Sequence, residues 1–197
     1  MVEDALRLKI PLIDLTDRHE TFALHQVWSD DGAIAELGAE HLLERGFQTF
    51  GFCGFAQEKW SDRRREGFVE AVGRKGWACQ TYESPWFGRD VHPWELEQQQ
   101  IMAWLRALPK PAGIMACNDY RGQHVLDACS RLDLAVPEEI AVIGVDDEEE
   151  LCELCEPPLS SVVPNAEMVG YRAAELLDRL MSGGGELESH LEIAPIA

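Results

Sequence analysis

The fold of this 197-residue chain is decided by residues 113–147, GIMACNDYRGQHVLDACSRLDLAVPEEIAVIGVDD. The stretch begins and ends with continuous apolar runs, residues 113–117 and 140–145, which are typical of strands buried on both faces of a parallel sheet. Between them apolar residues recur at helical spacing, with Arg121 on another face, until Pro137 ends the helix. The stretch therefore predicts two parallel neighbouring strands joined by one helix with a right-handed crossover.

Polar residues follow both predicted strands. Asn118 and Asp119 come directly after the first strand, and Asp146 and Asp147 come after the second. Because the carboxyl ends of parallel strands meet at the edge where open α/β folds bind ligands, these side chains should gather there. They are neutral or anionic and suit hydroxyl groups better than phosphates. The structural alternative is that such residues only cap the following turn, and Asp119 is predicted to cap the helix.

The same alternation of helices and strands extends through most of the chain. Further helices are predicted over residues 32–45, 63–75, 95–108 and 166–181, and further strands over residues 8–15, 24–28, 47–52, 79–82, 159–163 and 190–196. Residues 57–62 are predicted to be a loop, and the acidic run after Asp147 is predicted to lead into a turn. This order predicts an α/β fold with parallel sheets.

Composition excludes several classes of protein. The chain has 36 acidic and 17 basic residues, a net charge of -19, which argues against a surface that binds nucleic acid. The first 15 residues contain early acidic residues and no long apolar segment, so neither a signal peptide nor a membrane span is predicted. The six cysteines include several inside apolar patterns, which indicates free thiols in a reducing cytoplasm.

Six segments resemble, in order, the effector-binding domain of the LacI/GalR family of transcription regulators: IPLIDLTD, SDDGAIAELGAEHLLERGFQTFGFCG, DRRREGFVEAV, GIMACNDYRGQHVL, VPEEIAVIGVDDEE and PPLSSVVPNAEMVGYRAAELLDRLM. The resemblance covers nearly the whole chain. It implies a periplasmic-binding-protein-like fold of two α/β lobes, with a sugar, xylose or a related pentose, bound between them. It also implies that residues 1–28 and 164–185 belong to an incomplete N-terminal lobe, and residues 29–163 and 186–197 to the C-terminal lobe.

The candidate ligand-binding residues are Asp14, Trp60, Arg64, Trp86, Asn118 and Asp146. The resemblance implies sugar contacts for the four polar residues and an aromatic wall for Trp86. Trp60 is included because sugar sites commonly use aromatic rings against C–H groups. The structural alternatives are a solvated helix face for Arg64 and packing at the edge of a lobe for Trp60.

The sequence predicts no catalytic residue, cofactor or metal. Cys152 and Cys155 form a CxxC motif, but a metal site needs a second pair of ligands that is not evident. Cys117, His124 and Asp119 do not suggest a nucleophile triad, because Cys117 lies in a buried strand pattern and His124 lies within the helix.

The predicted function is that of a sugar-sensing domain of a transcription regulator of carbohydrate-utilisation genes. The resemblance implies a cytoplasmic homodimer that contacts DNA only through a module absent from this chain. Two alternatives remain open. A transport-type sugar-binding protein has the same fold, and an α/β enzyme would need a base, a nucleophile or a phosphate-binding loop, none of which is evident in the sequence.

Overall fold

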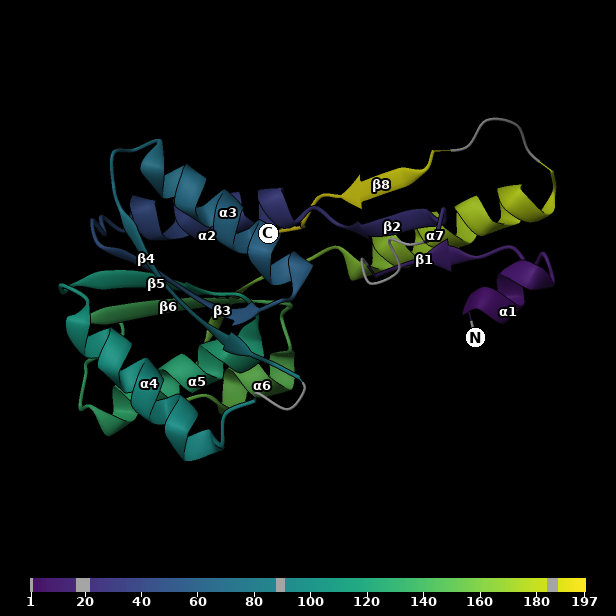
Figure 1. Ribbon diagram of the computed structural model, residues 1–197. Coiled ribbons are helices and arrows are strands. Elements are labelled where there is room, and N and C mark those ends of the chain that lie inside the picture. The colour runs from purple at the N-terminus through teal and green to yellow at the C-terminus, as the bar shows by residue number, and fades with distance from the viewer. Residues whose placement is uncertain (1, 17–21, 88–90, 184–187) are drawn as a thin grey trace. The chain divides into compact units, whose positions relative to one another are not determined.

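The computed structural model describes residues 2–16, 22–87, 91–183 and 188–197. The chain forms two compact units (Figure 1). Unit 1 comprises Met1–Asp30 and Asn165–Pro195, and unit 2 comprises Asp31–Pro164 with Ile196–Ala197. The α/β class with parallel sheets is confirmed, because every paired strand runs parallel to its neighbour in the described ranges.

Unit 2 is built on a five-stranded parallel sheet with the order β4-β3-β5-β6-β7. Its strands are β3 (Phe50–Ala56), β4 (Cys79–Pro85), β5 (Ala112–Ala116), β6 (Ile140–Val145) and β7 (Ser160–Val162). Its helices are α2 (Asp31–Glu44), α3 (Lys59–Gly73), α4 (Trp94–Ala107), α5 (Asp119–Arg131) and α6 (Glu149–Leu154). Helices α2 and α3 cover one face of the sheet and α4 and α5 cover the other (Figure 1).

The core of unit 2 lies on both faces of its sheet, because successive side chains of each strand point to opposite faces. Phe50 and Phe52 of β3 both pack on Phe68 of α3, with ring centroids 6.2 Å apart in each pair. Cys53 belongs to the opposite cluster with Ile101. A continuous apolar strand thus supplies both faces of the sheet, as its sequence predicts. The predicted unit of two parallel strands and a helix is confirmed, since β5 pairs in parallel with β6.

Unit 1 is a smaller layer of one sheet and two helices. Its parallel sheet has the order β1-β2-β8, formed by β1 (Ile13–Asp14), β2 (His25–Ser29) and β8 (His190–Ile193). Its helices are α1 (Val2–Arg7) and α7 (Ala166–Met181). Ala173 and Leu176 of α7 pack with Val27 and Ile193 of the sheet, so one stripe of this helix forms the small core. None of the described helices is both long and apolar enough to cross a bilayer.

Two local predictions were wrong. The predicted strand over residues 8–15 is reduced to two residues, because Pro11 cannot donate to a ladder. The predicted loop over residues 57–62 already contains the first turn of α3, whose opening residues are polar and show no apolar period. The sequence also showed no sign of the six-residue helix α6 in the acidic run after Asp147, because so short a helix shows no period.

The CxxC motif has a structural explanation in α6. Cys152 and Cys155 are buried free thiols that pack with Leu126 and Leu159. Within the described ranges, no three side chains of His, Cys, Asp or Glu are grouped so that they could hold a metal ion. The two cysteines therefore serve as small apolar core residues.

The last strand lies in a different unit from the one that the sequence indicated. Residues 186–197 were assigned to the lobe that contains residues 29–163, but β8 pairs with β2 in unit 1. Only Ile196–Ala197 returns to unit 2, where the backbone of Ala197 accepts a hydrogen bond from Val163 at 2.7 Å. A short strand carries no local signal for its partner, so its sequence could not distinguish the two sheets.

Candidate functional site

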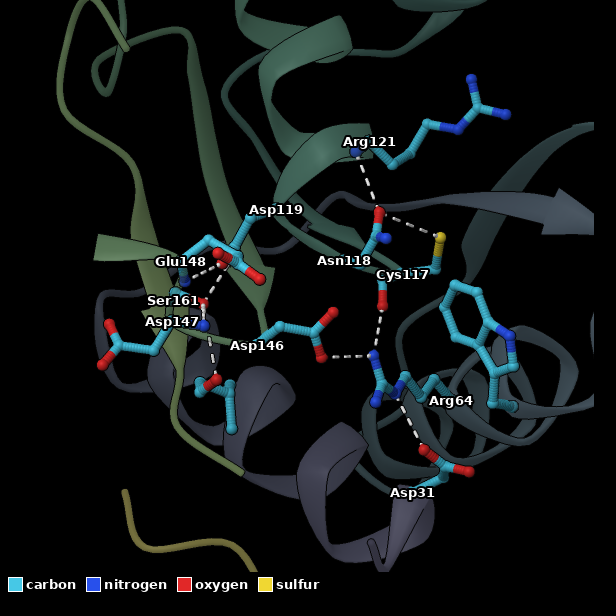
Figure 2. A network of polar contacts seen from close by, with 12 residues as sticks. Asp31, Arg64, Cys117, Asn118, Asp119, Arg121, Asp146, Asp147, Glu148 and Ser161 are labelled. Carbon is cyan, nitrogen blue, oxygen red and sulfur yellow. Dashed lines mark hydrogen bonds and ion pairs between the residues drawn. The ribbon is translucent and has the colours of Figure 1, made fainter. Parts of the chain in front are cut away.

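The turn after β6 holds Asp146 in an uncommon backbone conformation. Asp146 has a φ of 109° and Asp147 a φ of 55°, both in the region that non-glycine residues rarely adopt. The turn is fixed because Asp146 N donates to Val162 O at 3.2 Å and Asp147 N donates to Ser161 Oγ at 3.0 Å. Figure 2 shows the result, in which the Asp146 carboxylate faces the guanidinium of Arg64.

Arg64, on α3, is buried rather than solvated, with 6% of the residue exposed. Its Nε donates to Asp31 Oδ1 at 2.8 Å, and its Nη1 donates to Cys117 O at 2.7 Å and to Asp146 Oδ1 at 3.4 Å. These bonds fix the plane of the guanidinium. Its Nη2 has no hydrogen-bond partner within the described part of the chain, so one pair of donors stays available at the site.

Asn118, not Asp119, caps helix α5, so the prediction for Asp119 was wrong. Asn118 Oδ1 accepts from Arg121 N at 3.0 Å, and its extended backbone is that of an N-cap residue. Asp119 Oδ1 accepts instead from Ser161 Oγ at 2.7 Å, and its Oδ2 accepts from Glu148 N at 2.9 Å. Because the cap uses Oδ1 of Asn118, its Nδ2 is left as a donor without a partner among the described residues.

The electrostatics of the site come from three neighbouring carboxylates and Arg64. Partial burial of the Asp146 carboxylate, which removes part of its hydration, raises its pKa to about 6; Arg64 opposes this shift, and Asp119 and Asp31 add to it. Burial also raises the pKa of Asp31, against the effect of Arg64 and Arg63. At neutral pH Asp146 is ionised and accepts hydrogen bonds. Its side chain is 39% exposed, so the carboxylate is open to a ligand.

An aromatic cluster adjoins Arg64. The guanidinium lies 5.1 Å from the ring centroid of Trp60, whose edge meets Trp86 at 5.6 Å. Trp86 stacks on Phe55 at 4.8 Å and on Phe87 at 4.5 Å. Trp86 is thus packed against Trp60, Phe55 and Phe87, and its role as an aromatic wall stays a prediction.

Asp14 lies in unit 1, whereas the other five candidate residues lie in unit 2. Its buried carboxylate accepts from Thr16 N and Thr16 Oγ1 at 2.9 Å each, and from Gln26 Nε2 at 3.3 Å. The side chain therefore stabilises its own turn and the neighbouring strand. Within unit 2, contacts link Trp60, Arg64, Trp86 and Asp146 directly, and Cys117 O connects Arg64 to the strand end that carries Asn118.

Sequence reasoning missed Asp31, which is 5% exposed and binds both Arg63 and Arg64. The sequence did contain a signal, because an acidic residue at the start of a helix and a run of arginines were both evident. Nothing local indicated that the two segments meet.

Comparison with known proteins places the chain in a family. The profile of the periplasmic binding protein-like domain matches residues 39–196. The xylose operon regulatory protein of Haemophilus influenzae is 38% identical over 173 residues, which are 85% of this chain and 44% of that protein. Its namesake from Escherichia coli K12 is 34% identical over 163 residues, 80% of this chain and 41% of that protein.

A solved structure agrees with these sequence matches. The xylose-binding transcription activator XylR superposes with a TM-score of 0.82 and 28% identity, over 98% of this chain and 52% of that chain. This chain thus spans about half, or less, of the length of the relatives that it matches.

Proposed function

Because this chain belongs to the periplasmic binding protein-like domain family, we propose that it is the effector-binding part of a regulator of carbohydrate-utilisation genes, with xylose or a related pentose as effector. The predicted resemblance to LacI/GalR effector domains is confirmed by the same matches. The choice of sugar is supported by the names of the relatives, which are xylose operon regulators and a xylose-binding activator.

The observation that carries the proposal is a set of three polar groups with free hydrogen-bonding capacity in unit 2. Arg64 Nη2 and Asn118 Nδ2 offer donors, and the Asp146 carboxylate offers an acceptor. Asn118 and Asp146 follow the neighbouring strands β5 and β6 at the edge where open α/β sheets bind ligands. A sugar hydroxyl can donate and accept at once, so it matches this mixture of groups.

The proposal also covers the partners of the whole regulator. The matched relatives are named as operon regulatory proteins, which supports the proposal that the whole regulator works in the cytoplasm and contacts DNA. The net charge of -19 supports a separate module of the regulator for that contact, because a DNA-binding surface needs clustered basic residues. A homodimer is proposed on the same family grounds.

Replacing Asp146 with alanine is expected to weaken xylose binding. A hydrogen bond between a carboxylate and a hydroxyl contributes about 1.5–3 kcal/mol, so the dissociation constant should rise roughly 10- to 150-fold. Isothermal titration calorimetry measures this change. Asp127→Ala on α5 is the matched control and should bind as the wild type does. Unchanged affinity in Asp146→Ala, or no saturable binding of xylose to the wild type, would contradict the proposal.

Affinity for xylose is expected to fall on acidification below about pH 6. The pKa of Asp146, raised to about 6, leaves the carboxylate ionised at pH 7 and protonated below pH 6. Only the ionised carboxylate can accept hydrogen bonds from hydroxyls with both of its oxygens. The affinity for xylose should therefore fall by up to about tenfold for each pH unit between 6 and 4. Asp31 and Asp119 titrate nearby, each with a pKa that burial raises.

The variant Asp146→Asn separates these contributions. Its affinity should be lower at pH 7 and nearly flat from pH 7 to pH 5. A wild-type profile that is equally flat over this range would show that Asp146 does not contact the sugar as a carboxylate.

A further inference from the structure

A cavity of about 220 Å³ lies in unit 2, apart from the polar groups proposed to bind the sugar. It is lined by Phe55 of β3, by the end of β4 with Trp86, by Val91 and His92, and by residues of α4 and α5. Most of its wall is apolar and aromatic, with Trp86 and Trp94 as the largest side chains, and its polar groups are Ser84, His92, Glu97, Arg121 and His124.

The charged pair in the wall, Arg121 and Glu97, is neutral in sum, and Arg121 Nε is a buried donor without a hydrogen-bond partner among the described residues. Arg121 is fully buried, contrary to its predicted place on an outer helix face, and it forms an ion pair with Glu97. Its Nη2 donates to Ser84 Oγ at 2.6 Å and to Gly54 O at 3.0 Å. Burial alone raises the pKa of Glu97, but hydrogen bonding and the charge of Arg121 lower it overall, so the pair is ionised. A charged ligand would find no free counter-charge here.

His124 offers the cavity a defined donor. Its Nδ1 lies 3.4 Å from Arg121 Nη1, and because a guanidinium can only donate, Nδ1 must accept. Burial, followed by the charge of Arg121, lowers the pKa of His124 to about 4, so the imidazole is neutral at pH 7. The single ring proton therefore sits on Nε2, which has no partner among the described residues.

His92 lies in the same wall. Its Nδ1 lies 3.0 Å from Glu97 Oε2, and because a carboxylate only accepts, Nδ1 carries a proton. Its Nε2, like that of His124, has no partner among the described residues. The wall of the cavity thus carries a defined donor on His124 and a second ring nitrogen without a partner on His92.

We propose that this cavity is a second small-molecule site, which takes a single uncharged ring bearing a hydroxyl group. The volume of the cavity is sufficient for one ring, because an apolar cavity of about 150 Å³ binds benzene. The aromatic walls match the faces of a flat ring. A hydroxyl can accept a hydrogen bond from His124 Nε2, whereas a monosaccharide would leave most of its hydroxyls against the apolar part of the wall.

The test uses phenol as the probe and the whole 197-residue chain. Saturation-transfer NMR and calorimetry should show saturable binding of phenol to the wild type. The variant His124→Phe keeps a flat ring but removes the donor, and is expected to weaken binding about tenfold, the effect of one neutral hydrogen bond. His41→Phe on α2, outside the cavity, makes the same substitution and should leave binding unchanged.

The variant Asp146→Ala distinguishes this site from the proposed sugar site. It should lose xylose affinity and keep phenol affinity. No saturable phenol binding, equal affinity in His124→Phe and the wild type, or a parallel loss of phenol affinity in Asp146→Ala would each overturn the second site. Failure of the wild type to bind xylose would contradict the proposed function alone.

Discussion

Replacing Arg121 with methionine is expected to lower the free energy of unfolding of unit 2 by about 3–5 kcal/mol. The substitution keeps a long apolar stem but leaves the Glu97 carboxylate, 6% exposed, without its cationic partner. It also removes the bond to Gly54 O and the guanidinium that lies 4.0 Å from the ring centroid of Phe55. Strands β3 and β4 and helix α4 would each lose their contact with the guanidinium of Arg121.

Urea unfolding followed by tryptophan emission measures this loss, because five of the six tryptophans lie in unit 2. The double variant Arg121→Met with Glu97→Met is the control. It removes both charges together, so it should recover much of the loss, since a buried pair can often be replaced by apolar residues with little cost. A single variant that loses less than about 1 kcal/mol would show that the pair is not desolvated as the structure places it.

Replacing Gly144 with alanine is expected to destabilise unit 2 by about 3 kcal/mol, at the upper end of the range for overpacked cores. A Cβ at this position would collide with Asp119 Oδ1 and lie 3.2 Å from Asp119 Cα, so the carboxylate could not keep its place. Its bonds to Ser161 Oγ and Glu148 N would be lost together, and these bonds support the turn that presents Asp146.

The matched control is Gly73→Ala in the same unit. Gly73 ends α3 and has open space around the position of a Cβ, so alanine there should be neutral or stabilise by about 0.5–1 kcal/mol. Urea midpoints of the two variants should therefore move in opposite directions or differ strongly. Equal midpoints would contradict the close packing of β6 against Asp119.

The sequence contained the central part of the fold and of the site. Two continuous apolar runs predicted β5 and β6 as buried parallel neighbours, and this placed Asn118 and Asp146 at one edge. Both statements depend only on strand pattern and on the geometry of parallel sheets. Arg64 came from the family resemblance, and its burial shows which of three adjacent arginines faces inward.

The predictions that were wrong or missing concern residues whose partners lie in distant segments of the sequence. Asp31 binds Arg64 from 33 positions away in sequence, and Arg121 binds Ser84 from 37 positions away. A helical pattern assigns arginine to an outer face unless its partner is known, so Arg121 was placed wrongly. The choice between Asn118 and Asp119 as the cap also needed the backbone angles, because both residue types cap helices equally well.

The division of the chain into a continuous and a discontinuous unit has a consequence for the order of folding. Unit 2 is contiguous over Asp31–Pro164, so its sheet can form from neighbouring segments as soon as these have been synthesised. Unit 1 must join β2 to β8, and His25 contacts Glu188 across 163 positions. Closing so long a loop costs more entropy when the intervening chain is unfolded than when its ends already emerge from a folded body. Unit 2 is therefore expected to fold first and the smaller sheet to be completed after it, so a mutation that delays unit 2 should delay both.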